Sequence, residues 1–257
     1  MAEIIDLTGR TALVTGAGKN IGRACAEKLA NAGANVAITY QQNASLANAT
    51  AKELRDRGLN VIAVHCELTE KDSVVRTIAK ITEKLGPIDI VVNNAAIRPP
   101  VHLEDTTTEW WDLIMNTNAR GAFYISQLVM PRMIERKWGR IIFIGGIALY
   151  TGSVHTARDC AKTACLGMMR SLSLLGTPHG VTSNMVHPGF VDTKHDDVKF
   201  QGTDERRKER MKKHRMGHGS VAEDPAGMVL FLASENGRFI SGQELFVTGG
   251  MPPHLGI

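Results

Sequence analysis

The sequence predicts an α/β fold in which helices cover both faces of a doubly wound, mostly parallel sheet of about seven strands. Short runs rich in Val, Ile and other β-forming residues alternate with longer segments of helical period along all 257 residues. Parallel strands need crossover connections, which are usually helical and right-handed. A glycine-rich stretch also follows directly after the first strand-like run. Together these observations indicate a sheet built by repeated strand–helix crossovers.

Each expected strand is a short apolar run, and each expected helix carries apolar residues three or four positions apart. In the first part of the chain the expected order is strand 11–16, helix 21–32, strand 35–40, helix 44–57, strand 59–65 and helix 70–85. In the second part it is strand 88–94, one long helix at about 106–136, strand 139–146, a helix at about 155–176, strand 181–188, a polar stretch and strand 244–250.

Length and composition are those of one globular domain. Of the 257 residues, 43% are hydrophobic and 22% are charged, which is enough apolar material for a large core. The chain shows no internal repeat and no linker, and its longest irregular segment is at about 192–221. We therefore expect a single domain over residues 1–257.

Charge, hydropathy and cysteine usage exclude several classes of partner. The formal net charge of +4 is too small to indicate nucleic acid, although residues 204–215 are basic, which suits a solvated helix or an anionic partner. No apolar run approaches the roughly 20 residues that span a bilayer, and the N-terminal residues do not resemble a signal peptide. The four cysteines lack CxxC spacing, which favours reduced packing residues over disulfides or metal ligands. We expect a cytoplasmic protein that binds no nucleic acid, membrane or metal.

The glycine-rich stretch is TGAGKNIG, Thr15–Gly22. Glycines let the backbone turn sharply and approach a pyrophosphate, which sits on N–H groups at the positive end of a helix. The pattern is weak alone, but its place between the first strand and the first helix makes it a specific dinucleotide signal. The second strand ends in Tyr40 and two glutamines, with no acid for a ribose diol, while Lys19 is available for a 2′-phosphate. NADP is therefore expected rather than NAD, unless Lys19 is only a surface lysine.

Further motifs make nearly the whole chain resemble the short-chain dehydrogenase/reductase family. They are TGAGKNIG at 15–22, HCELTE at 65–70, NNAA at 93–96, TNARGAF at 117–123, GRIIFIGG at 139–146, HPGFVDT at 187–193 and FLASENGRFISGQELFVTGG at 231–250. The resemblance implies a Rossmann-type sheet with a cofactor groove at one edge. Asn20 stands where the family has a glycine, and Asn tolerates a left-handed backbone better than most residues.

The resemblance also implies which residues contact the cofactor. At the phosphates they are Gly16, Lys19, Asn20, Ile21 and Gly22, and Tyr40 joins them from the end of the second strand. Beside the adenine they are Glu67 and Leu68, at the nicotinamide ribose Asn94, Ala95 and Lys162, and at the nicotinamide Pro188, Gly189, Val191 and Thr193.

The reaction centre departs from the family. There, a Tyr four residues before the helix Lys passes a proton to the substrate oxygen, a Ser after strand five orients that oxygen, and an Asn supports a water relay. Lys162 and Asn118 occupy their expected places, but Arg158 stands at the Tyr position and Gly146 (or Gly145, with another loop count) at the Ser position. A guanidinium does not shuttle protons near neutrality. Because a positioned general acid is worth about 10² to 10⁴ in rate, the change argues against ordinary ketone reduction.

Replacement chemistry is available on the same helix. Apart from the adjacent pair 158 and 159, positions 155, 158, 159 and 162 are three, four or seven residues apart, so they are expected to share a helical face. Arg158 can hold an anion through paired N–H donors, and His155 can replace the missing acid or base. Asp159 can orient His155 or pair with Arg158.

Two residues outside this helix are further candidates. Tyr150 offers a hydroxyl in the loop after the fifth strand, and His187 precedes the Pro-Gly turn. The structural alternatives are that His155 only begins the helix, Arg158 is a surface charge, and Tyr150 and His187 are packing or backbone-bonded residues.

Three functions follow from these candidates. The first is an NADP(H)-binding oxidoreductase that acts on a small, anionic carbonyl or hydroxy compound, with Arg158 as anion clamp and His155 or Tyr150 as proton donor. The alternatives are a non-redox enzyme on the same fold, such as a lyase, hydratase or dehalogenating enzyme, and an inactive NADP(H)-binding subunit. The resemblance further implies a homotetramer and a polar substrate lid at about 192–221.

Overall fold

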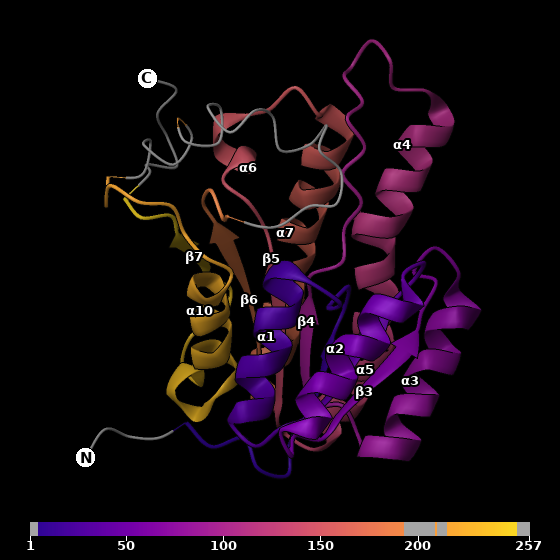
Figure 1. Ribbon diagram of the computed structural model, residues 1–257, viewed down its shortest axis with the longest axis vertical. Coiled ribbons are helices and arrows are strands. Elements are labelled where there is room, and N and C mark those ends of the chain that lie inside the picture. Colours follow the sequence, from indigo (N-terminus) through magenta and orange to yellow (C-terminus); the bar gives the residue numbers. More distant parts are fainter. Residues whose placement is uncertain (1–4, 193–208, 210–214, 251–257) are drawn as a thin grey trace.

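The strand-like runs of the sequence form one seven-stranded sheet in the computed structural model, which describes residues 5–192, 209 and 215–250 (Figure 1). The strands are β1 (Thr11–Val14), β2 (Asn35–Tyr40), β3 (Val61–His65), β4 (Ile90–Asn93), β5 (Gly139–Ile144), β6 (Val181–Pro188) and β7 (Glu244–Val247). Their order is β3-β2-β1-β4-β5-β6-β7, and every pairing is parallel. The predicted doubly wound sheet is confirmed.

The direction of winding reverses between β1 and β4. The chain adds β2 and β3 on one side of β1, and then β4 to β7 on the other side. In open α/β sheets, ligands bind beyond the carboxyl ends of the strands at such a switch point. The loops after β1 and β4 are therefore the place to look for a site.

The helices form a layer on each face of the sheet (Figure 1). They are α1 (Asn20–Asn31), α2 (Ala44–Asp56), α3 (Lys71–Leu85), α4 (Thr108–Met115), α5 (Gly121–Glu135), α6 (Ala148–Thr151), α7 (Thr156–Gly176) and α10 (Glu223–Ala233). One buried cluster joins α1, α2 and α10 to the sheet, and a second joins α3, α5 and α7 to its other face. None of the helices in the described part of the chain is long and apolar enough to cross a bilayer.

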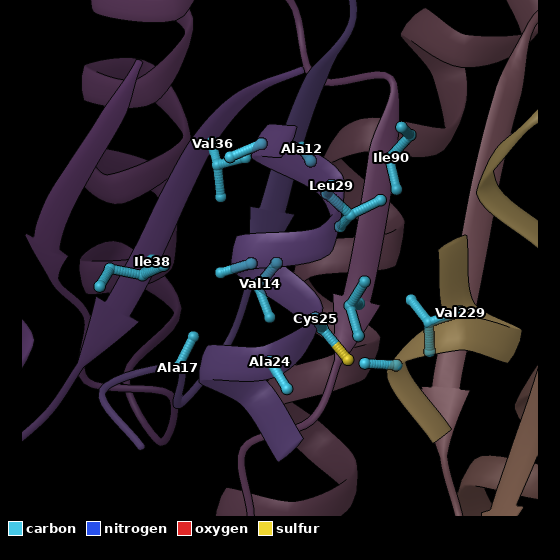
Figure 2. Packing of buried hydrophobic residues seen from close by; sticks show 14 of the residues in the cluster. Ala12, Val14, Ala17, Ala24, Cys25, Leu29, Val36, Ile38, Ile90 and Val229 are labelled. Carbon is cyan, nitrogen blue, oxygen red and sulfur yellow. The ribbon is translucent and has the colours of Figure 1, made fainter. Parts of the chain in front are cut away.

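Alternation along β1 shows how the two cores arise. Ala12 and Val14 are buried in the first cluster, whereas Leu13 between them is buried in the second. Figure 2 shows Cys25 and Leu29 of α1 packed in the first cluster with Ala12 and Val14. Full burial of a side chain such as Leu29 contributes about 2 kcal/mol. This packing fixes the N-terminus of α1 at the carboxyl end of β1.

The structure differs from the sequence predictions in three elements. The helix expected at 106–136 is divided into α4 and α5 by a π turn at Asn116–Arg120. The segment expected to be only polar contains α10, whose apolar residues lie on most of its sides because it packs against both α1 and the sheet. A helix buried in this way has no apolar stripe to detect. The short helix α6 was also not expected.

The four cysteines are free thiols, as expected. Cys25, Cys66 and Cys165 are buried, so their interpretation as packing residues is confirmed. Cys160 is exposed, and for it that interpretation was wrong.

Candidate active site

The glycine loop after β1 has backbone geometry that only glycine allows at two positions. Gly16 has a left-handed φ of +62°, and a Cβ there would lie 2.9 Å from the Cα of Ala95. A Cβ at Gly22 would lie 2.5 Å from Nδ2 of Asn94. That Nδ2 donates to the carbonyl oxygens of Thr15 (2.8 Å) and Gly16 (3.0 Å). Asn94 thus ties the glycine loop to the end of β4, and the loop can approach a ligand closely.

The N-terminus of α1 completes this cradle. Asn20 has φ 54°, which is the left-handed backbone expected when Asn replaces glycine. The side chain of Lys19 at the N-cap makes no capping hydrogen bond, so the helix end presents backbone N–H groups that a side chain does not cover. Ile21 and Gly22 are buried in the first turn beneath them. Close-approach glycines and an uncapped helix N-terminus fit a diphosphate.

The residues predicted near the adenine lie at the ends of β2 and β3. Gln41 donates to Oε2 of Glu67 (2.5 Å), while the backbone N–H and hydroxyl of Thr69 donate to Oε1 (3.0 and 2.7 Å). Burial opposes ionisation of Glu67, but these hydrogen bonds outweigh it and lower the pKa of the carboxyl below its usual value. Tyr40 packs edge-on against His65, with ring centroids 5.7 Å apart. Leu68 is buried against Gly121.

Arg158 lies in the first turn of α7, with its guanidinium held on one side. Its Nη2 donates to Oγ of Ser153 (2.9 Å), and Nε and Nη2 each lie 3.3 Å from Oδ1 of Asp159. Only 22% of the Arg158 side chain is exposed, so it is not a freely solvated surface charge. The expected shared face is realised in part, because Asp159 contacts Arg158 while Nδ1 of His155 lies 3.2 Å from the carbonyl oxygen of Val101.

Lys162 and Asn118 both lie beneath this turn. Lys162 is half-buried, and its Nζ donates to the carbonyl oxygen of Ile144 at the end of β5 (2.6 Å). Burial, with help from the charges of Arg98 and Arg158, lowers the pKa of Lys162 below its usual value. Asn118 lies in the π turn, an irregularity frequent at functional sites, and its carbonyl oxygen accepts from Sγ of Cys165 (3.2 Å).

Tyr150 and His187 meet at Glu244 of β7. The Tyr150 hydroxyl donates to Oε2 of Glu244, and Nε2 of His187 lies 3.1 Å from the same oxygen. Nδ1 of His187 lies 3.2 Å from both the N–H and the carbonyl oxygen of Gly146, so it can accept from the first or donate to the second. Burial lowers the pKa of His187 and raises that of Glu244. Arg170 also binds Glu244, at 2.8 Å.

The two glycines after β5 are not equivalent. A Cβ at Gly145 would lie 2.6 Å from Nδ1 of His187, whereas a Cβ at Gly146 would meet nothing within 4 Å. Of the two positions left open by the sequence, Gly146 is therefore the one that can carry a serine side chain.

The segment after β6 begins where the sequence places the nicotinamide contacts. Pro188 ends β6, Gly189 donates to the carbonyl oxygen of Val247 (2.9 Å), and Val191 forms a parallel bridge with Ser220. The two ends of the expected lid are thus side by side. Thr193 and most of the lid lie outside the described residues.

Sequence reasoning missed three residues of this region: Arg98, Ser153 and Glu244. Glu244 lies 94 positions from Tyr150, and no local pattern indicates that contact. Ser153 belongs to an irregular loop. The one available signal for Arg98 was that it directly follows the NNAA motif and Ile97.

Comparisons with known proteins agree with this geometry. A family model described as enoyl-(acyl carrier protein) reductase matches residues 16–252. The 3-oxoacyl-(acyl-carrier-protein) reductase FabG of Aquifex aeolicus is 34% identical over 250 residues, which cover 96% of this chain and 99% of that protein. The same enzyme of Haemophilus influenzae is 35% identical over 247 residues, with coverages of 95% and 99%.

Solved structures are similarly close. A blue fluorescent protein from a metagenomic library, in complex with NADPH, has a TM-score of 0.86 at 34% identity and covers 96% of this chain and 99% of its own. A putative NAD(P)-dependent gluconate 5-dehydrogenase from Beutenbergia cavernae, with NADP bound at low occupancy, has a TM-score of 0.89 at 30% identity, with coverages of 97% and 99%.

Proposed function

Because the chain belongs to the short-chain dehydrogenase/reductase family, we propose that it is an NADP(H)-binding oxidoreductase with an altered reaction centre. Its substrate is a small, anionic carbonyl or hydroxy compound. The observation that carries this proposal is the position of Arg158, which lies half-enclosed one helical turn before Lys162 in a chain that keeps the dinucleotide cradle. A guanidinium there can bind a negative charge and cannot replace a phenol as acid.

NADP(H) is the cofactor. Structures similar to this chain contain NADPH or NADP, and the residues after β2 include no acid directly following Tyr40. When bound, the nicotinamide delivers hydrogen with two electrons to a carbonyl carbon, or removes them from a carbinol carbon. The residues proposed to hold the cofactor are Gly16, Lys19, Asn20, Ile21, Gly22, Tyr40, Glu67, Leu68, Asn94, Ala95, Lys162, Pro188, Gly189, Val191 and Thr193.

Arg158 orients the substrate in this proposal. Ser153 and Asp159 take up part of its hydrogen-bonding capacity and hold the guanidinium plane, which leaves further N–H donors for a carboxylate. A preformed donor array loses little freedom when the anion binds, so it adds to both affinity and alignment. Asp159 also offsets one unit of charge and keeps the site from being purely cationic.

His155 is the proposed proton donor or acceptor at substrate oxygen. If Nδ1–H donates to the Val101 carbonyl oxygen, the tautomer is set and Nε2 is the nitrogen that exchanges a proton. Tyr150, the second candidate, already donates its proton to Glu244. We therefore assign Tyr150 with His187 to a supporting network and His155 to proton transfer.

Purified protein tests this function with NADPH and matched substrates. Small oxo acids should be reduced, with loss of absorbance at the NADPH band, whereas neutral ketones of the same size should react far more slowly. Arg158→Gln should remove the preference for acids and leave NADPH affinity nearly unchanged. Arg132→Gln, at an exposed position of α5, is the control for a lost surface charge.

Other outcomes separate the alternatives. Tight NADPH binding with no turnover of any acid would contradict the oxidoreductase and favour a cofactor-binding subunit. Release of water, halide or a carbon fragment without net oxidation of cofactor would favour a non-redox enzyme.

We also propose a homotetramer. Apolar side chains of α5 and α7 line a surface groove, and Phe123 and Leu175 in it are 43% and 58% exposed. Met168 and Leu172 line the same groove, whereas Met169 is buried in the core of the chain itself. A second copy would cover this groove. Cytoplasmic location stays a prediction.

A further inference from the structure

Hydrogen bonds hold the loop after β4 near α7 at two points, and Figure 1 shows the two elements close to each other. At one end, Asn118 clamps Ile97: its Oδ1 accepts from the Ile97 N–H (2.8 Å) and its Nδ2 donates to the Ile97 carbonyl oxygen (3.1 Å). The carbonyl oxygen of Asn118 in turn accepts from Cys165 of α7. At the other end, Val101 contacts His155. The loop therefore runs beside α7, with Ile97 toward Cys165 and Val101 at His155.

Arg98 is the cationic residue between these two anchors. It follows Ile97 directly, and the stretch of α7 opposite it carries Arg158 and Lys162. The charges of these residues act on one another: burial and the charge of Arg158 lower the pKa of Arg98, and both arginines lower that of Lys162. The structure thus gathers three cationic side chains, from two separate segments, above the carboxyl ends of β4 and β5.

Among the described residues, few acidic groups lie near these three cations. Asp159 pairs with Arg158, and Lys162 is bonded to a neutral carbonyl oxygen. Arg98 makes no ion pair or hydrogen bond through its side chain with any residue in the described ranges. Like charges brought together and partly desolvated disfavour the folded state unless an anion binds them. With one acid among three cations, the net charge of the group is +2.

Arg98 is also accessible to a ligand. The residue is exposed, yet burial is the largest cause of its lowered pKa. Both hold for a side chain that protein atoms surround on several sides but that solvent still reaches. A guanidinium in such a place binds carboxylates and phosphates through two parallel N–H donors.

We propose that Arg98 and Arg158 together form a two-arginine site for a substrate that carries two negative charges, as a phosphate monoester or a dicarboxylate does. Arg98 is the specificity-determining residue of this pair, because Asp159 already offsets the charge of Arg158. The proposal deepens the proposed function, since the same substrate would react beside His155, and it narrows the substrate class from anionic to dianionic.

Equilibrium binding tests this without turnover. Calorimetry on the NADP-saturated protein would compare inorganic phosphate and succinate with acetate. We expect at least one of the two dianions to bind at least about tenfold more tightly than acetate. The dianion that binds more tightly shows whether the site prefers a phosphate or a dicarboxylate. Arg98→Gln should weaken the preferred dianion about tenfold or more and change acetate binding less than threefold. Arg98→Lys should recover part of the loss, because it keeps the charge without the paired donors.

The control variant removes an arginine far from this site. Arg76→Gln removes an exposed arginine on α3 and should change nothing. Equal affinity for acetate and both dianions, or unchanged dianion affinity in Arg98→Gln with normal folding by circular dichroism, would overturn the two-arginine site. If monoanionic oxo acids are still reduced in that case, the proposed function stands. If dianions bind through Arg98 but no oxo acid is ever reduced, the site stands and the oxidoreductase fails.

Discussion

The carbonyl oxygen of Val101 lies 3.2 Å from Nδ1 of His155. This contact joins the loop after β4 to the residue that begins α7, and it orients an imidazole beside the turn that carries Arg158. If His155 transfers the proton, His155→Gln should lower kcat by about 10² to 10⁴ while Kd for NADPH stays within a factor of three.

The control for this prediction is His102→Gln. His102 packs edge-on against His155, with centroids 5.6 Å apart, so its loss disturbs packing near the ring without removing the transferring group. Equal losses of kcat in both variants would show that His155 is only structural.

Restoring the family side chains should restore ordinary carbonyl chemistry. Gly146 has open space for a Cβ, so Gly146→Ser fits, and Arg158→Tyr would return a phenol four residues before Lys162. The double variant should reduce neutral ketones about 10² to 10⁴ faster than the natural sequence. Assays with NADPH and a neutral ketone measure this gain. Gly145→Ser with Arg158→Tyr is the matched control, because a Cβ at 145 would collide with His187. Equal rates from both double variants would contradict the assignment of position 146.

The contact between Gly22 and Asn94 should dominate the stability of the cofactor cradle. In Gly22→Ala the new methyl group would lie 2.5 Å from Asn94 Nδ2 and 2.7 Å from the Gly16 carbonyl oxygen. We expect a loss of about 1–3 kcal/mol in the free energy of unfolding, and weaker NADPH binding. Gly18→Ala is the comparison, since its Cβ would be 3.6 Å from Ala47, an ordinary contact. Urea unfolding of both variants measures the difference, and equal stabilities would be inconsistent with the tight packing.

His187 should make the fold sensitive to acid. Burial lowers its pKa below the value of 6.5 expected in the unfolded chain. As pH falls below about 6.5, the unfolded chain takes up a proton that the native ring refuses, so stability drops by at most about 1.4 kcal/mol per pH unit. In His187→Gln this contribution should be absent, and stability should fall less between pH 6.5 and 5. His179→Gln, at an exposed position, is the control. Parallel stability–pH curves for all three proteins would contradict the prediction.

The groove between α5 and α7 should hold copies of the chain together. Phe123→Asp places a charge in it, and a charge buried in an apolar interface is strongly disfavoured. Size-exclusion chromatography with light scattering should show a tetramer for the natural chain and smaller species for this variant. Leu103→Asp, at a 67% exposed position of another loop, should stay tetrameric. A natural chain that is monomeric at all concentrations would contradict the proposal.

The elements predicted from sequence were those whose signal is local. Alternation of strand and helix periods identified the sheet, and TGAGKNIG identified the cradle because its position after β1 is itself part of the signal. The π turn was missed because one added residue leaves the helical pattern nearly unchanged over 106–136. Helix α10 was missed because its burial removes the apolar stripe.

The candidate site could be predicted only in part, because contacts between distant segments of the chain arrange its residues. Shared spacing placed His155, Arg158 and Asp159 on one face, yet His155 bonds to Val101, 54 positions away. The closeness of Arg98 to Arg158 could not be predicted from sequence, because it depends on the contacts of its loop with Asn118 and His155. Such tertiary contacts decide which acidic group pairs with which basic group, and a pattern in one sequence does not predict them.

The most direct measurement is a crystal structure with NADP and an anionic substrate analogue bound. We expect the analogue between the nicotinamide C4 and the Arg158 guanidinium, with its carboxylate or phosphate at hydrogen-bonding distance, about 2.7–2.9 Å, from guanidinium N–H groups. An Arg158 side chain turned out to bulk water, or a nicotinamide position filled by the protein's own atoms, would contradict it.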